Sequence, residues 1–128
     1  MPQPSQQSIG GLTMSGDGAS MIFTTFPSIE AAREVARALV EAKLAACVNI
    51  IPAVVSIYRW DGAVCEDAEV AALIKTRREL VADVMMAIAA RHPYATPALV
   101  AYDIATGSHD YLNWIVSSTA QPTILSPS

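Results

Sequence analysis

The sequence predicts a single α+β domain in which helices pack on one face of an antiparallel sheet. Three observations predict this class. Short runs rich in β-branched residues occur near both ends of the chain, two long runs of the same kind meet at an Asp-Gly pair, and two other segments have apolar residues at helical spacing. A chain of 128 residues, 52% of them apolar, is long enough for one domain with its own core.

Composition divides the chain into three parts. Residues 1–19 mix Pro, Gln, Ser and Gly without a hydrophobic period, so we expect a disordered leader there. Residues 20–118 form the expected domain, and residues 119–128 form a tail. Every predicted strand and helix therefore falls within residues 20–118.

The first strand and the first helix follow one another closely. Residues 21–26 (MIFTTF) are β-branched and aromatic and stop at Pro27, which is typical of a buried strand. Ser28 is a good N-cap residue for the helix that follows. The predicted buried stripe of that helix is Ile29, Ala32, Ala36, Leu39 and Val40, and its predicted solvent face is Glu30, Glu34, Arg37 and Glu41.

A long antiparallel hairpin comes next. Residues 47–60 (CVNIIPAVVSIYRW) and 64–75 (VCEDAEVAALIK) flank Asp61-Gly62, a strong signal for a tight turn. Helical spacing then returns at residues 77–91, where the predicted buried stripe is Leu80, Val84, Ala87 and Ile88. Residues 98–104 (ALVAYDI) predict a second short buried strand, and a short closing helix follows Ser108. This order is the ferredoxin-like βαββαβ arrangement.

The hairpin is too long for the domain that carries it. A strand of some fourteen residues reaches roughly 45 Å, whereas a domain of this size is roughly 35 Å across. Pro52 should break the first strand or sit at a bulge, so that residues 53–66 project beyond it. The projecting part carries Val54, Ile57, Tyr58 and Trp60, which predicts a homo-oligomer joined through it. The alternative is a bent hairpin that folds back on its own domain.

Charge and cysteine content exclude several classes of protein. The net charge is −4 and the eight cations are dispersed, so we expect no nucleic-acid partner. The chain has no apolar run of membrane-spanning length and no signal-peptide pattern, so we expect no membrane partner and a cytoplasmic location. If Asp61-Gly62 is the turn, Cys47 and Cys65 lie on the order of 35 Å apart along the hairpin, which predicts two free thiols.

Six short motifs in order resemble the CutA divalent-cation tolerance proteins over roughly residues 21–117. They are TTFP (24–27), LAACVN (44–49), SIYRWDG (56–62), IKT (74–76), HPY (92–94) with Pro97, and YLNW (111–114). The resemblance implies a homotrimer whose long hairpins embrace neighbouring subunits. It also implies a link to copper tolerance and metal binding in bacteria, and to acetylcholinesterase anchoring in animals. The family has no settled catalytic reaction.

Metal binding is the first functional hypothesis. Thiolate and imidazole suit copper, and the candidate ligands are His92, Cys47 and Cys65, with His109 as the other histidine. No two of them have the spacing of a preformed site, so a site must be assembled from distant segments or across subunits. A divalent cation such as Cu²⁺ is the expected ligand, and no cofactor is expected to be obligatory. In the family pattern HPYE an acid follows the tyrosine, but Ala95 stands there in this chain.

Each candidate ligand also has a structural interpretation. His92 can simply end the second helix, where a partly cationic ring is favoured by the helix dipole and Pro93 turns the chain away. Cys47, beside two alanines, can be a small core residue. Cys65 lies among acidic residues near the turn, which disfavour its thiolate but help to hold a cation.

A second functional hypothesis comes from aromatic and cationic residues. The sheet arrangement of the family is similar to that of the PII signalling proteins, and an intersubunit cleft could bind a small anionic ligand. The expected cleft or interface residues are Tyr58, Arg59, Trp60, Lys75, Tyr94 and Trp114. Their structural interpretation is interface packing with peripheral salt bridges. We expect no enzyme, because the sequence lacks the common catalytic motifs and no orienting acid follows His92.

Overall fold

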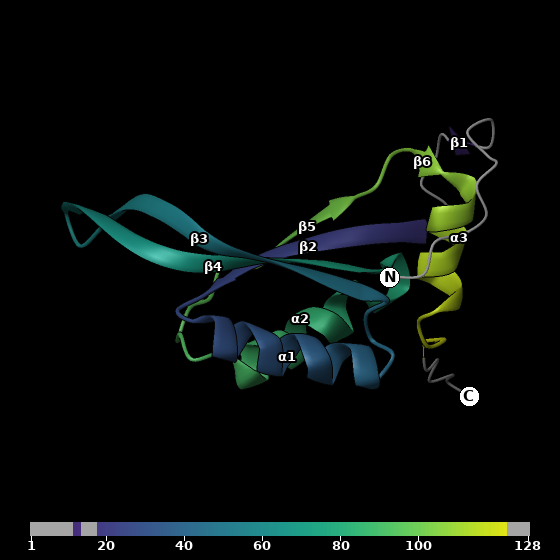
Figure 1. The fold of residues 1–128 in the computed structure, drawn as a ribbon, viewed down its shortest axis with the longest axis horizontal. Coiled ribbons are helices and arrows are strands. Elements are labelled where there is room, and N and C mark those ends of the chain that lie inside the picture. The colour runs from purple at the N-terminus through teal and green to yellow at the C-terminus, as the bar shows by residue number, and fades with distance from the viewer. Residues whose placement is uncertain (1–11, 14–17, 123–128) are drawn as a thin grey trace.

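The computed structural model describes residues 12–13 and 18–122 (Figure 1). The elements are β1 (Leu12–Thr13), β2 (Ala19–Phe26), α1 (Ile29–Glu41), β3 (Cys47–Trp60), β4 (Ala63–Arg77), the 3₁₀ turn η3 (Arg78–Leu80), α2 (Val81–Arg91), β5 (Val100–Asp103), β6 (Gly107–Ser108) and α3 (His109–Ser117). Four of the strands form an antiparallel sheet in the order β3-β4-β2-β5. Helices α1 and α2 lie on one face of this sheet and α3 lies at one end (Figure 1), so the predicted α+β class is confirmed.

Helix α1 begins where its sequence predicts but is rotated relative to the prediction. The Ser28 Oγ accepts a hydrogen bond from the Ala31 amide at 3.1 Å, which confirms the N-cap. The buried residues are Ala32, Val35 and Leu39, whereas Val40 is 42% exposed. The prediction that Val40 is buried is wrong, because Val35 and Leu39 lie at the centre of the buried stripe and Val40 is turned toward the edge of the sheet.

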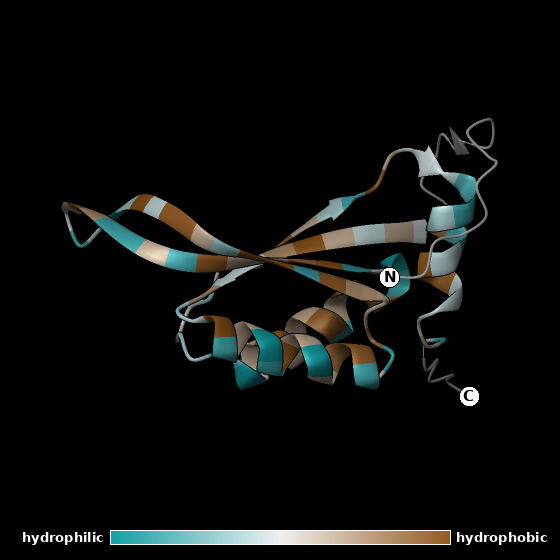
Figure 2. Cartoon of the chain, in the orientation of Figure 1, coloured by the Kyte–Doolittle hydropathy of each residue, from teal (hydrophilic) through white to brown (hydrophobic). Residues whose placement is uncertain are grey.

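The core lies between the sheet and helices α1 and α2. Its largest buried side chains are Phe26, Ile22, Leu39, Ile74, Ile88 and Val84. A smaller cluster of Ala19, Leu112 and Ile115 lies under α3. Figure 2 shows brown, apolar residues along the strands of the sheet and alternating with teal, hydrophilic residues along the helices.

Strand β5 is not the buried strand that the sequence predicts. It pairs only with β2, and its residues Val100 and Tyr102 are 44% and 52% exposed. It is an edge strand of the sheet, and among the described residues no further strand pairs with its outer edge. Apolar composition indicated a strand correctly but not its place in the sheet.

The core contains one buried hydroxyl group with no partner among the described residues, the Thr24 Oγ1. Thr24 is fully buried on β2. Replacing Thr24 with Val keeps the shape of the side chain and removes the unpaired oxygen, so we expect the free energy of unfolding to rise by about 1 kcal/mol. Urea unfolding of both proteins at equal concentration measures the change. A lower stability of the Val variant would contradict the assignment, and Thr25→Val provides a matched control on the same strand.

A β-bulge at Pro52 divides the long hairpin, as predicted. Ile51 pairs with Ala71 and Val54 pairs with Glu69, so two residues of β3 oppose one residue of β4. Ala53 takes up the irregularity with a φ of 64°. Because of this extra residue, Cys47 pairs with Lys75 and not with Thr76 as the turn position alone predicts.

Beyond the bulge the hairpin projects from the body of the domain as an arm, defined here as residues 53–69. Strand β2 ends opposite Val70, so the rest of β4 pairs with β3 alone (Figure 1). Asp61 and Gly62 at the tip have φ of 54° and 80°, as a type I′ turn requires. The arm extends about 23 Å past the bulge. The alternative of a hairpin folded back on its own domain is therefore wrong.

The ends of the described chain extend the predicted domain. Leu12–Thr13, within the expected leader, pairs with Gly107–Ser108, and Ala19 is fully buried at the start of β2. The other leader residues before position 18 lie outside the described residues. Beyond position 118, Thr119 is buried and the Ala120 amide donates to the Lys43 carbonyl at 2.8 Å. Packing therefore continues into the expected tail as far as the described chain reaches.

Candidate functional site

His92 ends α2 with both ring nitrogens engaged. Its Nε2–H donates to the Thr25 carbonyl at 2.7 Å, and its Nδ1 accepts from the Tyr94 amide at 3.1 Å. The ring also stacks on Phe26, with ring centroids 4.6 Å apart. Since a carbonyl can only accept and an amide can only donate, this arrangement holds a neutral ring and not the partly cationic one expected at a helix end. A metal ion that binds His92 must displace one of these hydrogen bonds.

The segment after His92 ties α2 to two strands. Strand β2 ends at Phe26, and the Tyr94 hydroxyl reaches past this end to donate to the Glu69 Oε2 at 2.9 Å. The rings of His92 and Tyr94 lie 4.9 Å apart. Glu69 thus supplies a carboxylate beside the segment in which Ala95 replaces the acid of the family pattern. The sequence pointed to Glu69 only as one of the acids near Cys65 and did not predict its contact with Tyr94, although its place beside the predicted bulge was an available signal.

One face of the arm carries acidic groups in a row. Cys65, Asp67 and Glu69 alternate along β4 and share a face, with roughly 7 Å between neighbours. Tyr58, which pairs with Cys65 across the hairpin, donates its hydroxyl to the Asp67 carboxylate. This hydrogen bond is the main cause that raises the pKa of Tyr58 to about 12. Within the described residues, no three His, Cys, Asp or Glu side chains come together as a metal site.

The Tyr94–Glu69 contact gives a pH prediction. Burial, then the hydrogen bond to Glu69 and the charges of Glu69 and Asp67, raise the pKa of Tyr94 from 10.0 to about 12. Because the folded-state pKa is raised, the protonated hydroxyl contributes stability that is fully present below pH 10 and is lost as the pH rises through about 12. In Glu69→Gln the charge is gone and burial remains, so the pKa of Tyr94 should fall part of the way toward 10.

Phenolate absorbance during an alkaline titration measures this shift, with Tyr94→Phe used to assign the transition. Glu66→Gln, elsewhere on the arm, is the matched control and should leave the transition in place. A Tyr94 transition that does not move in Glu69→Gln would contradict the assignment.

Cys47 lies far from both other candidate ligands. It is half-buried on β3, and its thiol contacts the Asn49 Oδ1 at 3.7 Å. Its pairing partner Lys75 lies ten residues from Cys65 along β4, on the order of 33 Å. Both cysteines are free, as predicted. The structure therefore places the three predicted ligands, His92, Cys47 and Cys65, at three different positions of one chain.

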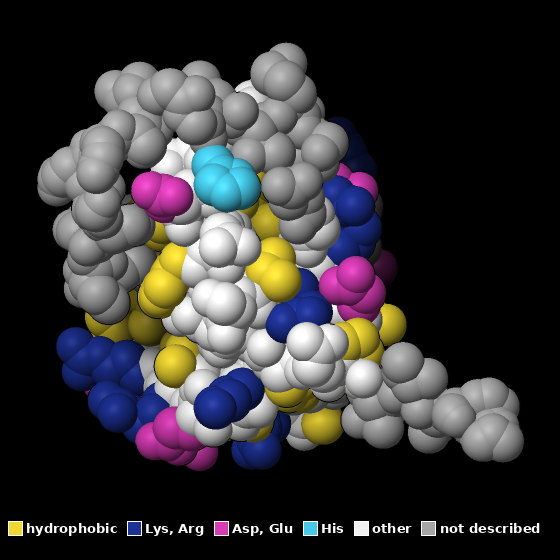
Figure 3. Space-filling model, turned by 90° about the vertical axis from the view of Figure 1, so that its right-hand side faces the viewer, with side chains coloured by type: hydrophobic (Ala, Val, Ile, Leu, Met, Phe, Trp, Pro, Cys, Tyr) yellow, Lys and Arg dark blue, Asp and Glu magenta, His cyan; other side chains and the backbone are white. Residues whose placement is uncertain are grey.

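The predicted cleft residues also fall at separate places. Tyr58, Arg59 and Trp60 lie near the tip of the arm and Tyr94 lies at its base. At the opposite end of the sheet, the Lys75 Nζ donates to the Tyr111 hydroxyl at 3.1 Å. The Tyr111 ring stacks on Trp114 with centroids 5.6 Å apart, so Lys75 and Trp114 belong to one cluster beneath α3. Figure 3 shows this end of the molecule, where basic and acidic side chains are interspersed.

The fold and these contacts define a class of protein: a small α+β domain with one projecting two-stranded arm, and no metal cluster or membrane-spanning helix among its described residues. Residues 20–118 match the family described as CutA1 divalent ion tolerance protein. The chain belongs to this family, which confirms the resemblance seen in its motifs.

Individual relatives agree with the family assignment. The divalent-cation tolerance protein CutA of Thermus thermophilus is 46% identical over 99 residues, which are 77% of this chain and 96% of the relative. The human protein CutA is 41% identical over 113 residues, which are 88% of this chain and 63% of the relative. A solved structure of the T. thermophilus protein has a TM-score of 0.77 at 45% identity and covers 80% of this chain and 99% of its own.

Proposed function

We propose that this protein is a ferredoxin-like homotrimer that binds divalent cations, copper above all, and acts in tolerance of metal ions. Its family name supports the role in tolerance. The strand order β3-β4-β2-β5, with helices between β2 and β3 and between β4 and β5, supports the ferredoxin-like classification. A cytoplasmic location, no obligatory cofactor and no enzymatic activity complete the proposal.

The observation that carries the trimer is the exposed arm. Val55, Ile57, Trp60 and Val64 are 62–68% exposed, on a ribbon that has a free edge on each side. Apolar surface of this kind on a projecting hairpin favours association, because it is otherwise open to uncontrolled edge pairing. The resemblance to the family supplies the number three.

The arm also explains how distant ligands could meet. Cys65 pairs with Tyr58 near the tip of the arm, so an arm laid on a neighbour could bring this thiol near that neighbour's ligands. Imidazole and thiolate together suit copper. A metal ion requires a neutral imidazole, and the hydrogen bonds of His92 suit that form. Metal binding at its Nδ1 would replace the hydrogen bond from the Tyr94 amide.

Calorimetric titration tests the ligand assignment. We expect copper affinity to fall at least tenfold when His92→Ala is combined with Cys47→Ser and Cys65→Ser, and zinc serves as a probe that does not oxidise thiols. The matched control is His109→Ala, an exposed histidine on α3, which should leave the isotherm unchanged. An isotherm that survives the triple replacement would overturn the assignment. Saturable protection from melting by nucleotides or small anions without metal would favour the PII-like alternative instead.

A further inference from the structure

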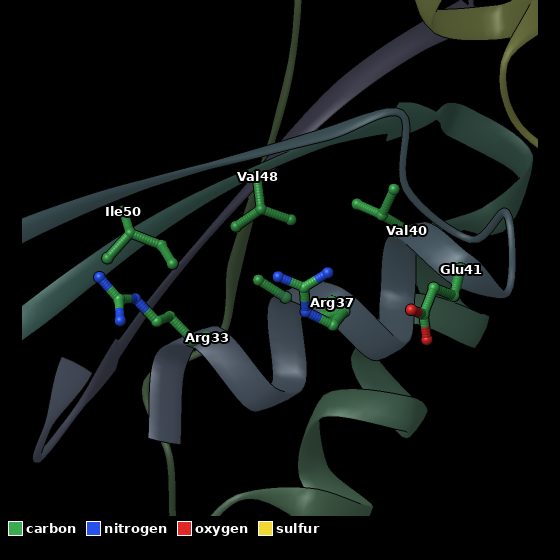
Figure 4. Close-up of a pocket in the computed structure, with 7 residues that line it drawn as sticks. Arg33, Arg37, Val40, Glu41, Val48 and Ile50 are labelled. Carbon is green, nitrogen blue, oxygen red and sulfur yellow. The ribbon is translucent and has the colours of Figure 1, made fainter. Parts of the chain in front are cut away.

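A groove of about 330 Å³ lies between α1 and β3, and neither the arm nor any candidate metal ligand lines it (Figure 4). Its apolar lining consists of Val48 and Ile50 from β3 with Ala36 and Val40 from α1. Strand β3 is at the edge of the sheet, so the groove is open on one side. Val40, left 42% exposed by the rotation of α1, contributes an uncovered apolar side chain.

Two arginines stand over this apolar lining. Arg33 and Arg37 are one helical turn apart on α1, and both guanidinium groups lie between α1 and β3, whereas the carboxylate of Glu41 points away (Figure 4). The one ion pair within the described part of the chain joins Arg78 and Asp103, so neither arginine of the groove forms an ion pair there. Like charges four residues apart on a helix repel each other, and an anion between them would relieve that repulsion.

We propose that this groove binds a small organic anion, with a carboxylate or phosphate group held by Arg33 and Arg37 and a short apolar body lying on Val40, Val48 and Ile50. Arginine suits both kinds of anionic group because its planar donors match two oxygens at once. The volume falls within the range of small-molecule sites, at its lower end, which limits the ligand to a short body. The proposal goes beyond cation binding, which a pair of arginines opposes.

Methyl resonances of Val48 and Ile50 provide the readout, and the probes are octanoate, octyl phosphate, neutral octanamide and inorganic phosphate. We expect octanoate or octyl phosphate to shift both resonances saturably, and octanamide and inorganic phosphate to bind at least about tenfold more weakly. Whichever of the two amphiphiles binds identifies the anionic group. Replacing Arg33→Gln together with Arg37→Gln should weaken binding about tenfold or more, since the charged hydrogen bonds are lost.

The matched control is Arg91→Gln, an exposed arginine at the end of α2 that does not line the groove, and it should bind as the unaltered protein does. Three outcomes would overturn the proposal: no saturable shift with either amphiphile, equal binding of octanamide, or amphiphile binding that survives the double arginine replacement. If inorganic phosphate bound as tightly as octyl phosphate, the apolar lining would contribute nothing to binding, and that part of the proposal would be wrong. The proposed copper ligands include none of these residues, so the outcome of the copper titration does not affect this test.

Discussion

Replacing Arg77 with Ala is expected to lower the free energy of unfolding by about 3 kcal/mol. Arg77 ends β4 and is only 8% exposed. Its Nη2 donates to the Val116 carbonyl at 2.6 Å and to the Thr119 carbonyl at 3.0 Å, and its Nε donates to the Thr119 Oγ1 at 3.1 Å. The Val116 carbonyl is in the last turn of α3, where such groups lack helical partners and a cation is favoured.

The physical reason for the large effect is that three hydrogen bonds from one buried side chain are lost together. Arg77→Ala removes the donors that reach the Val116 carbonyl, the Thr119 carbonyl and the Thr119 Oγ1, and it releases the chain after Ser117 from β4. Arg77→Lys keeps the charge but cannot reach several oxygens from one planar group, so it should recover only part of the loss. Urea unfolding at fixed protein concentration measures all three proteins.

Arg91→Ala is the matched control for this prediction. Arg91 is an exposed arginine in the last turn of α2, and its loss should change stability by no more than about 0.5 kcal/mol. Equal effects of the two alanine variants would contradict the anchoring role of Arg77. So would full recovery of stability by Arg77→Lys.

The second large effect is expected from the arm. Replacing Ile57 and Trp60 with Asp should convert the proposed trimer to monomers, because both side chains are 66% exposed in one chain and would be buried by its neighbours. Burying an apolar side chain of this size contributes about 1.5–3 kcal/mol, and a buried unpaired carboxylate reverses that gain. Static light scattering after size exclusion measures the change in mass, which should fall threefold.

Met86→Asp controls for the general effect of adding charge to an exposed apolar position. Met86 is 69% exposed on α2, away from the arm, so its variant should keep the mass of the unaltered protein. The arm variant should also keep its far-ultraviolet circular dichroism, since neither replaced residue belongs to the core. A double arm variant with unchanged mass would contradict assembly through the arm, as would an unaltered protein that is monomeric at low micromolar concentration.

Signals that act within a few residues were sufficient to predict the helices and the four strands of the main sheet, but not the short pair β1 and β6. Ser28 accepts a hydrogen bond from an amide three residues away, Asp61-Gly62 has the left-handed conformation that its turn needs, and Pro52 cannot donate to a ladder. Each signal depends on the conformation of its own short stretch of backbone. The sequence also predicted the projecting arm, because strand length and domain size suffice for that comparison.

Contacts between distant segments were decided only by the tertiary structure. One extra residue in the bulge sets Cys47 opposite Lys75, and the end of β2 leaves room for Tyr94 to reach Glu69. Likewise, strand order leaves β5 exposed, and the rotation of α1 turns Val40 toward the groove. By itself the sequence determined the helices, the four strands of the main sheet and a hairpin longer than its domain. Only the folded chain decided which side chains are in contact, because such contacts depend on strand register, strand order and helix rotation. These are set by packing across the whole domain, and no short stretch of sequence determines them.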